Sequence, residues 1–282
     1  MTQRNHPEQG DDKGDVRMNL RTYGKKPYRV ALVHGGPGAA GSMKPVCEAL
    51  AGYVGVLEPL QTKNTIEGQL LELKSVLEAH TSEPVVLMGH SWGAMLSYMF
   101  AATYPQMVKK LIMVASGNLE HRYVEAMNKR RAEKSKQLPA GDAQALHDLQ
   151  AALSNPNEND KHTLFAAYGA LMDQLDSYDP IHSPTDTSRY DYDIFRTIWS
   201  EASMLRNSGE LLAMGKHITC KVVVIHGTHD AHPAHGIEAS LRRVLEDFTF
   251  VLLEKCGHTP WLEKQAKETF YEVMIEEIED IR

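Results

Sequence analysis

The chain has 282 residues, of which 42% are hydrophobic, so it is long enough for one large domain with an insertion or for two small domains. Its net charge of −7 comes from 30 basic and 37 acidic residues without a basic stripe, which argues against a nucleic-acid partner. Three widely spaced cysteines indicate neither a disulfide framework nor a zinc site, and they suit a reducing compartment.

The N-terminal region is polar. Residues 1–14 contain almost no apolar side chains and are expected to form a disordered tail. Residues 1–29 lack the apolar segment of a signal peptide, and no apolar run in the chain approaches the length of a membrane span. We therefore expect a cytoplasmic protein without a membrane partner.

Short apolar runs alternate with helical patterns along most of the chain. A strand is expected over 16–23, and clearer ones over 28–33, 53–57, 85–88, 111–114, 222–225 and 250–253. These runs are continuously apolar, as in strands that are buried on both faces. A helix with an apolar face follows a capped start at Asn64, and another helix ends the chain. The alternation predicts a mostly parallel, doubly wound sheet with helices on both faces.

The middle of the chain departs from this rhythm. Residues 119–214 contain no strand-like run, and charged helical patterns separated by turns dominate there. We expect this segment to be a helical cap inserted into an α/β core made of residues 15–118 and 215–282.

A candidate nucleophile lies where the third clear strand meets a helix. Residues 89–93 read Gly-His-Ser-Trp-Gly, a G-x-S-x-G pattern between an apolar run and a helical stretch. Glycines two places on either side allow the tight turn that exposes the Ser91 hydroxyl at a helix N-terminus. The pattern predicts a serine that attacks carbonyl carbons.

The serine needs a base and an acid that orients it, and two later loops provide candidates. Asp230 follows the strand at 222–225, and His258 follows the strand at 250–253. The order Ser, Asp, His is that of the α/β-hydrolase arrangement. Glu58 is the other acid that we consider, whereas Asp247 precedes its strand and is a poor substitute.

A glycine-rich segment, residues 34–38 (His-Gly-Gly-Pro-Gly), follows the first clear strand. Glycines let the backbone approach a ligand and point N–H groups at it. We expect the N–H groups of Gly36 and Trp92 to form an oxyanion hole. His34 and Gly35 are expected beside the substrate, with His34 shaping this loop rather than acting as a base.

Four histidines recur every third residue and raise the possibility of a metal site: His226, His229, His232 and His235. They occupy a strand end and a proline-containing loop rather than one helix, so we expect no metal there. Cys256 is expected to be a small packed residue.

Together these motifs resemble the α/β-hydrolase superfamily over residues 20–118 and 215–282. The His-Gly-Gly-Pro-Gly segment is similar to that of the proline-iminopeptidase-like branch, and Gly-His-Ser-Trp-Gly is compatible with it. In that branch acidic cap residues bind the free amino terminus of the substrate, which makes Glu201 a candidate substrate contact. Trp199, an aromatic residue of the cap, is a further candidate because such residues can form part of a substrate wall as well as the core. The chain departs from many relatives at residues 58–62, which lack a D-x-x-G-x-G pattern.

We therefore predict a serine hydrolase that cleaves a carboxylic ester or amide of a small molecule or short peptide through an acyl-enzyme. The arrangement implies no metal and no organic cofactor. Two alternatives stay open: a proline-iminopeptidase-like aminopeptidase, and a non-catalytic ligand-binding protein on a hydrolase scaffold. Carbon–carbon or cyanohydrin lyase chemistry uses the same triad in some relatives, whereas haloalkane dehalogenation needs a carboxylate where Ser91 stands.

Overall fold

The computed structural model describes residues 19–181 and 189–279, so the expected tail at 1–14 lies outside the described residues. Its main sheet has the strand order β1-β4-β2-β5-β6-β8-β9, in which β1 is antiparallel to β4 and the other neighbours are parallel. The main strands are β1 (Leu20–Tyr23), β2 (Tyr28–Val33), β4 (Gly55–Pro59), β5 (Val85–His90), β6 (Val108–Val114), β8 (Lys221–Gly227) and β9 (Phe248–Leu253). The predicted mostly parallel sheet is confirmed.

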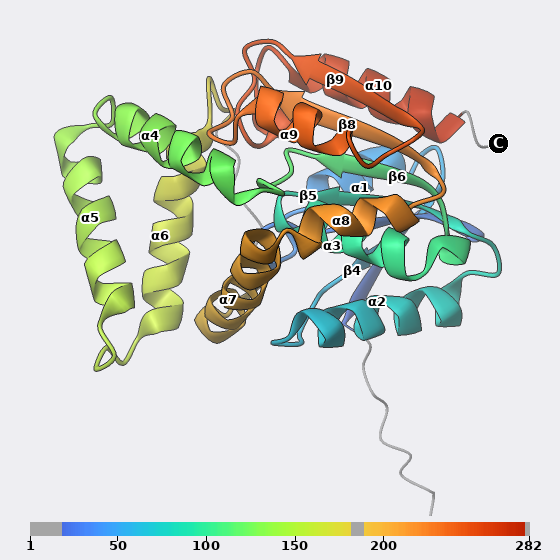
Figure 1. Cartoon of the computed structure of the whole chain (residues 1–282), viewed down its shortest axis with the longest axis horizontal. Helices are drawn as coiled ribbons and strands as arrows, with labels where there is room; N and C mark the ends of the chain where they lie inside the picture. Colours follow the sequence, from blue (N-terminus) through green and yellow to red (C-terminus); the bar gives the residue numbers. More distant parts are fainter. Residues whose placement is uncertain (1–18, 182–188, 280–282) are drawn as a thin grey trace, which may run out of the picture.

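Helices cover both faces of this sheet (Figure 1). The helices of the α/β layers are α1 (Lys44–Leu50), α2 (Ile66–His80), α3 (Trp92–Thr103), α9 (Ala234–Leu241) and α10 (Lys267–Glu279). Short 3₁₀ turns occur at η1 (Pro105–Met107), η2 (His121–Tyr123), η3 (Met214–His217) and η4 (Pro260–Leu262). No helix in the described part of the chain combines the length and the apolar character that a bilayer crossing requires.

Successive residues of the central strands enter opposite halves of the core. In β5, Leu87 packs in a cluster with α2 and α3, whereas Val86 and Met88 pack in a second cluster with α1 and α10. All three side chains are fully buried. The period of two along a strand explains why a doubly covered strand reads as an unbroken apolar run.

The chain between β6 and β8 forms a helical insertion. It contains α4 (Val124–Ser135), α5 (Ala140–Ser154), α6 (Lys161–Asp176), α7 (Tyr192–Ser208) and α8 (Glu210–Ala213). Helices α4, α5 and α6 stand to one side of the sheet, while α7 and α8 lie along its α2–α3 face (Figure 1). Leu211 of α8 is buried in the core cluster of that face, so core packing begins before the predicted cap boundary at 214.

The insertion also carries a short strand that the sequence did not predict. Strand β7 (Arg189–Tyr190) pairs antiparallel with β3 (Ala39–Ala40), which directly follows the glycine-rich loop at 34–38. The expectation of an all-helical segment at 119–214 is therefore wrong at this point. A two-residue strand exists only through its distant partner, so it leaves no period-two pattern in the sequence.

Candidate active site

Ser91 occupies a strained turn between β5 and α3. Its backbone φ of 54° is unusual for a residue with a side chain, and its N–H donates to the Val114 carbonyl at 2.9 Å. A Cβ added at Gly89 would lie 2.0 Å from the Gly93 carbonyl oxygen, and one at Gly93 would lie 2.2 Å from that of Val33. The turn therefore requires both glycines that the sequence pattern singles out.

A chain of hydrogen bonds joins the three residues that the sequence predicted as nucleophile, base and orienting acid. The Ser91 hydroxyl lies 2.9 Å from Nε2 of His258, and Nδ1 of His258 lies 2.7 Å from Oδ2 of Asp230. A carboxylate can only accept, so Nδ1 carries the ring proton and Nε2 is free to accept the proton of Ser91. Asp230 is 1% exposed, and the His258 side chain is 14% exposed.

The charges along this chain of hydrogen bonds favour the protonated form of His258. Burial alone would lower the pKa of His258, but the charge and hydrogen bond of Asp230 outweigh burial and raise it above its ordinary value. Burial alone would raise the pKa of Asp230, but the neighbouring histidines, His258 first, hold it well below its usual range. Asp230 is therefore an anion, and its charge favours the protonated form of His258.

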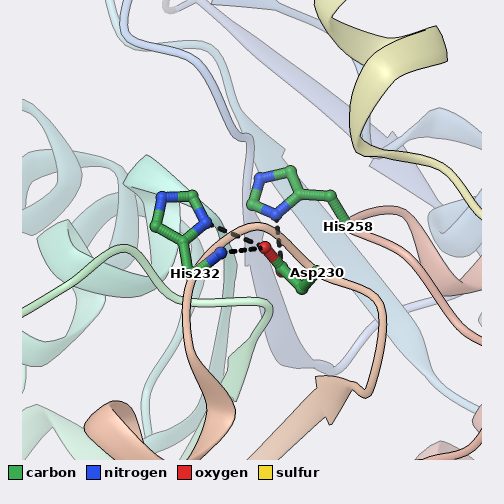
Figure 2. A group of neighbouring side chains, drawn as sticks. All are labelled: Asp230, His232 and His258. Carbon is green, nitrogen blue, oxygen red and sulfur yellow. Dashed lines mark hydrogen bonds and ion pairs between the residues drawn. The ribbon is translucent and has the colours of Figure 1, made fainter. Parts of the chain in front are cut away.

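Two of the four regularly spaced histidines, His226 at the end of β8 and His232 in the loop after it, approach the carboxylate of Asp230. His232 donates to Oδ1 of Asp230 twice, from its backbone N–H at 2.8 Å and from Nδ1 at 2.9 Å (Figure 2). His226 donates from Nε2 to the His232 carbonyl at 3.0 Å and lies 3.7 Å from Oδ2 of Asp230. His232 was missed as a site residue, although an Asp followed two residues later by a donor is a known turn pattern.

The other buried histidines near Ser91 resist protonation. Burial lowers the pKa of His90 to about 3 and that of His34 to about 4, and it also lowers the pKa values of His226 and His232. Within the described cluster, the imidazole whose pKa is raised is His258. Of these histidines, His258 is therefore the one that most readily holds a proton near neutral pH.

The glycine-rich loop lies directly against the serine. A Cβ on Gly35 would lie 2.6 Å from Nδ1 of His90 and 3.2 Å from Cβ of Ser91, so a larger residue would not fit there. Gly36 follows with φ of 51°. His34 is fully buried and accepts the Gln61 N–H on Nε2 at 3.2 Å, so it shapes the loop and does not reach the substrate space.

Helix α6 of the insertion fixes the His258 loop. The His258 N–H donates to the Asp176 carbonyl at 2.9 Å. Glu263, which is 1% exposed, accepts the N–H groups of Tyr178, Asp179 and Gly257 at 2.8, 2.8 and 2.9 Å. The segment after α6 and the loop that carries His258 are therefore held as one unit.

A cavity of about 950 Å³ opens onto Ser91 and His258, between the sheet and the insertion. Gly35, Gly36 and Trp199 line it, as the sequence suggested, and Trp199 packs edge-on against the buried Trp92 with ring centroids 5.8 Å apart. Asp173 of α6 also lines the cavity, and burial among its neighbours raises its pKa to about 6. The sequence gave no reason to single out Asp173.

Two acidic residues weighed from the sequence lie elsewhere. Glu201 is not part of the cavity lining; its Oε2 accepts the N–H of Ile66 at 2.8 Å, at the start of α2. Thr65, rather than the expected Asn64, is the N-cap of α2. Glu58 is fully buried and accepts the Tyr23 hydroxyl at 2.7 Å, so it belongs to the β1–β4 edge and not to the site of Ser91.

The arrangement also offers one group of metal-ligating types. Asp230, His232 and His258 have ligand atoms within 4.8 Å of one another (Figure 2). The two Nδ1 atoms each donate a hydrogen to the carboxylate, so a cation would have to displace both protons. The position of Ser91 on the far nitrogen of His258 fits proton transfer better than metal binding.

Comparisons with known proteins agree with the fold. The family model described as alpha/beta hydrolase family matches residues 30–273. The crystal structure of VinJ has a TM-score of 0.67 at 22% identity, covering 93% of this chain and 95% of that chain. The proline iminopeptidase of Mycobacterium smegmatis has a TM-score of 0.60 at 19% identity, covering 93% and 94%.

Among curated sequences, Epoxide hydrolase 4 of Homo sapiens is 33% identical over 66 residues, which is 23% of this chain. The chain spans less than a fifth of the length of the curated relatives it matches. The family match instead runs through both halves of the sheet, from β2 into α10. This chain belongs to the alpha/beta hydrolase family.

Proposed function

We propose that the protein is a serine hydrolase that cleaves a carboxylic ester or amide of a small molecule. The observation that carries this proposal is the continuous hydrogen-bond chain from the Ser91 hydroxyl through His258 to Asp230, open to a cavity. Such a chain lets a neutral imidazole remove the serine proton while the carboxylate stabilises the resulting cation.

In the proposed reaction the Ser91 oxygen attacks the acyl carbon as His258 takes its proton. His258 then gives this proton to the leaving alcohol or amine, and an acyl-serine ester remains. Water attacks the ester with His258 again as base, which releases the acid and restores Ser91. The backbone N–H groups of Gly36 and Trp92 are the proposed oxyanion donors, each worth about 3 kcal/mol in the transition state.

Epoxide opening, suggested by the name of the curated relatives, fits this site poorly. Attack by a serine oxygen on an epoxide carbon forms an alkyl ether, which has no acyl carbon for water to attack. A carboxylate nucleophile would form an ester that water can release, but position 91 carries a hydroxyl. The serine therefore favours acyl substrates.

Aminopeptidase activity of the proline-iminopeptidase type is the second candidate. The His-Gly-Gly-Pro-Gly loop and the fold likeness to the Mycobacterium smegmatis enzyme favour it. Glu201, the residue expected to recognise the substrate amine, instead accepts a hydrogen bond from the N–H of Ile66 at the start of α2. We therefore rank the small-molecule hydrolase first.

A binding protein without activity would gain nothing from a base whose pKa is raised by a buried acid.

The test is labelling with a fluorophosphonate probe, followed by turnover of p-nitrophenyl esters and of proline, alanine and leucine p-nitroanilides. We expect stoichiometric labelling that Ser91→Ala abolishes, while Ser75→Ala, a change on the exposed side of α2, leaves it intact. Ester turnover with inert anilides supports the first candidate, whereas preferred proline anilide supports the second. A folded protein that neither labels nor turns over any substrate would contradict both.

A further inference from the structure

One face of α7 forms a wall of the cavity. Phe195, Trp199, Ser203 and Arg206 line it at helical spacing, so their side chains project on the same side. The wall changes character along the helix, from aromatic rings beside the nucleophile to a hydroxyl and a guanidinium. Such a change suits a ligand with an apolar body and a polar end.

Arg206 is a half-buried cation without a counter-charge among the described residues. Its Nη2 donates to the Ser203 hydroxyl at 3.1 Å, and its Nε is buried with no acceptor among the described residues. Burial lowers its pKa, and no opposite charge in the described chain offsets this effect. A half-buried guanidinium without an opposite charge lowers the stability of the protein when no ligand is bound.

Arg131 in the same cavity lining provides an internal comparison. It binds Asp176 with both a 2.6 Å and a 3.4 Å hydrogen bond, and this pair outweighs burial and raises its pKa. Lys264 of the lining is likewise paired, with Asp179 at 2.7 Å. Arg206 is therefore the cation of the described lining that has no carboxylate partner among the described residues.

Building on the proposed hydrolase function, we propose that Arg206 and Ser203 form a subsite for a carboxylate that the substrate carries away from its scissile bond. A planar carboxylate matches the fork at the end of the guanidinium and would supply the opposite charge that Arg206 lacks among the described residues. A monoanion fits better than a phosphate dianion, because one unpaired cation is offered and Asp173, Asp176 and Asp179 also line the cavity.

The length of the helix sets the reach of the ligand. Trp199 lies beside Gly117, which lines the cavity together with Ser91, and beside Trp92, the residue after Ser91; Arg206 follows seven residues later. At a rise of 1.5 Å per residue the two positions are about 10 Å apart along α7. The preferred substrate therefore has a spacer of several carbons between its carboxylate and the reacting carbonyl.

The test compares p-nitrophenyl half-esters of succinate, adipate and suberate with uncharged p-nitrophenyl esters of the same chain lengths. A parallel pair, 4-acetoxybenzoate and phenyl acetate, places the carboxylate on the leaving group instead. We expect kcat/KM to be higher for the charged member of at least one pair. Arg206→Gln should lower kcat/KM for that charged ester by about 10- to 100-fold, through a higher KM. The same variant should change kcat/KM for the uncharged esters by less than about threefold.

Two variants separate charge recognition from folding. Arg206→Lys keeps the charge and should retain part of the preference, and Arg196→Gln makes the same charge change on the exposed side of α7 and should have no effect. Equal kcat/KM for charged and uncharged esters in the wild-type protein would overturn the subsite. So would an Arg206→Gln variant that loses activity equally on both.

A binding measurement keeps this inference independent of turnover. Suberate should raise the melting temperature of wild-type protein more than the uncharged octanamide does, and Arg206→Gln should abolish that difference. If Ser91 labels and esters are cleaved but suberate gives no such shift, the subsite is wrong and the hydrolase proposal stands. If suberate binds through Arg206 while Ser91 neither labels nor reacts, the hydrolase proposal is wrong and the carboxylate site stands.

Discussion

Replacing Asp230 by asparagine tests the electrostatic core of the site, because His232 dictates how the new amide must lie. Oδ1 of Asp230 accepts two donors from His232, at 2.8 and 2.9 Å. An amide nitrogen placed there would leave two buried donors unsatisfied, at about 1–3 kcal/mol each. The amide oxygen therefore stays toward His232, and its NH₂ group faces Nδ1 of His258.

That orientation puts the wrong tautomer on the base. An NH₂ group donates to Nδ1, so the ring proton of His258 moves to Nε2, where it blocks transfer from Ser91. We expect Asp230→Asn to keep the fold and lose about 10⁴-fold in kcat, the loss typical of such a triad. Removing the anion also lowers the pKa of His258, so the acid limb of kcat/KM should move to lower pH.

The assay is steady-state hydrolysis of a p-nitrophenyl ester from pH 5 to 9, with circular dichroism to verify folding. Asp247→Asn, which neutralises an exposed acid just before β9, serves as the matched control and should behave like the wild type. An Asp230→Asn variant within a few-fold of wild type would refute the reasoning, and Asp230 would then not be the acid.

Three further predictions concern the base, its loop and the glycine-rich loop. Because His258 must be neutral to act and its pKa is raised, wild-type kcat/KM should fall with decreasing pH around a midpoint above the ordinary value of about 6.5; a flat profile from pH 5 to 8 would exclude it as base. Glu263→Gln exchanges one acceptor oxygen for a donor that faces a backbone N–H, so urea unfolding should show a free energy of unfolding lower by about 1–3 kcal/mol. The kcat should fall as well, because Glu263 holds the loop that carries His258. An unchanged free energy of unfolding would contradict this role of Glu263. Gly38→Ala places a Cβ 2.1 Å from the Asp191 carbonyl oxygen at a φ of 78°, so this variant should have a lower melting temperature and a lower kcat/KM. Gly52→Ala is the control and should change neither quantity, because a Cβ there meets nothing within 4 Å. Equal behaviour of the two variants would argue against the contact between Gly38 and Asp191.

The strands and the three central residues could be predicted because each depends on local sequence. The apolar run at 85–88 marks β5, and the G-x-S-x-G pattern marks the turn that follows. The strand ends were less accurate: β5 continues through His90, because its backbone keeps pairing with β6 whatever side chains it carries. Asp230 and His258 could be found because parallel strands bring their carboxyl ends to one edge.

Contacts between distant segments could not be predicted. Glu201 looked like a substrate ligand, yet its partner is a backbone N–H 135 residues earlier in the chain. Glu263 has no pattern that reveals three N–H groups waiting around it. Arg206 has the sequence pattern of an ordinary surface residue, and only the folded insertion shows that no described residue supplies an opposite charge to it.

The central claim is that Ser91 carries the acyl group during turnover. Rapid mixing with a p-nitrophenyl ester, quenching in acid and peptide mass spectrometry measure this directly. The proposed mechanism predicts a burst of p-nitrophenolate close to one equivalent per chain when deacylation is slow, and an acyl mass located on Ser91. Turnover in which solvent ¹⁸O enters the product while no acyl group ever appears on Ser91, even with slowly deacylating esters, would contradict it.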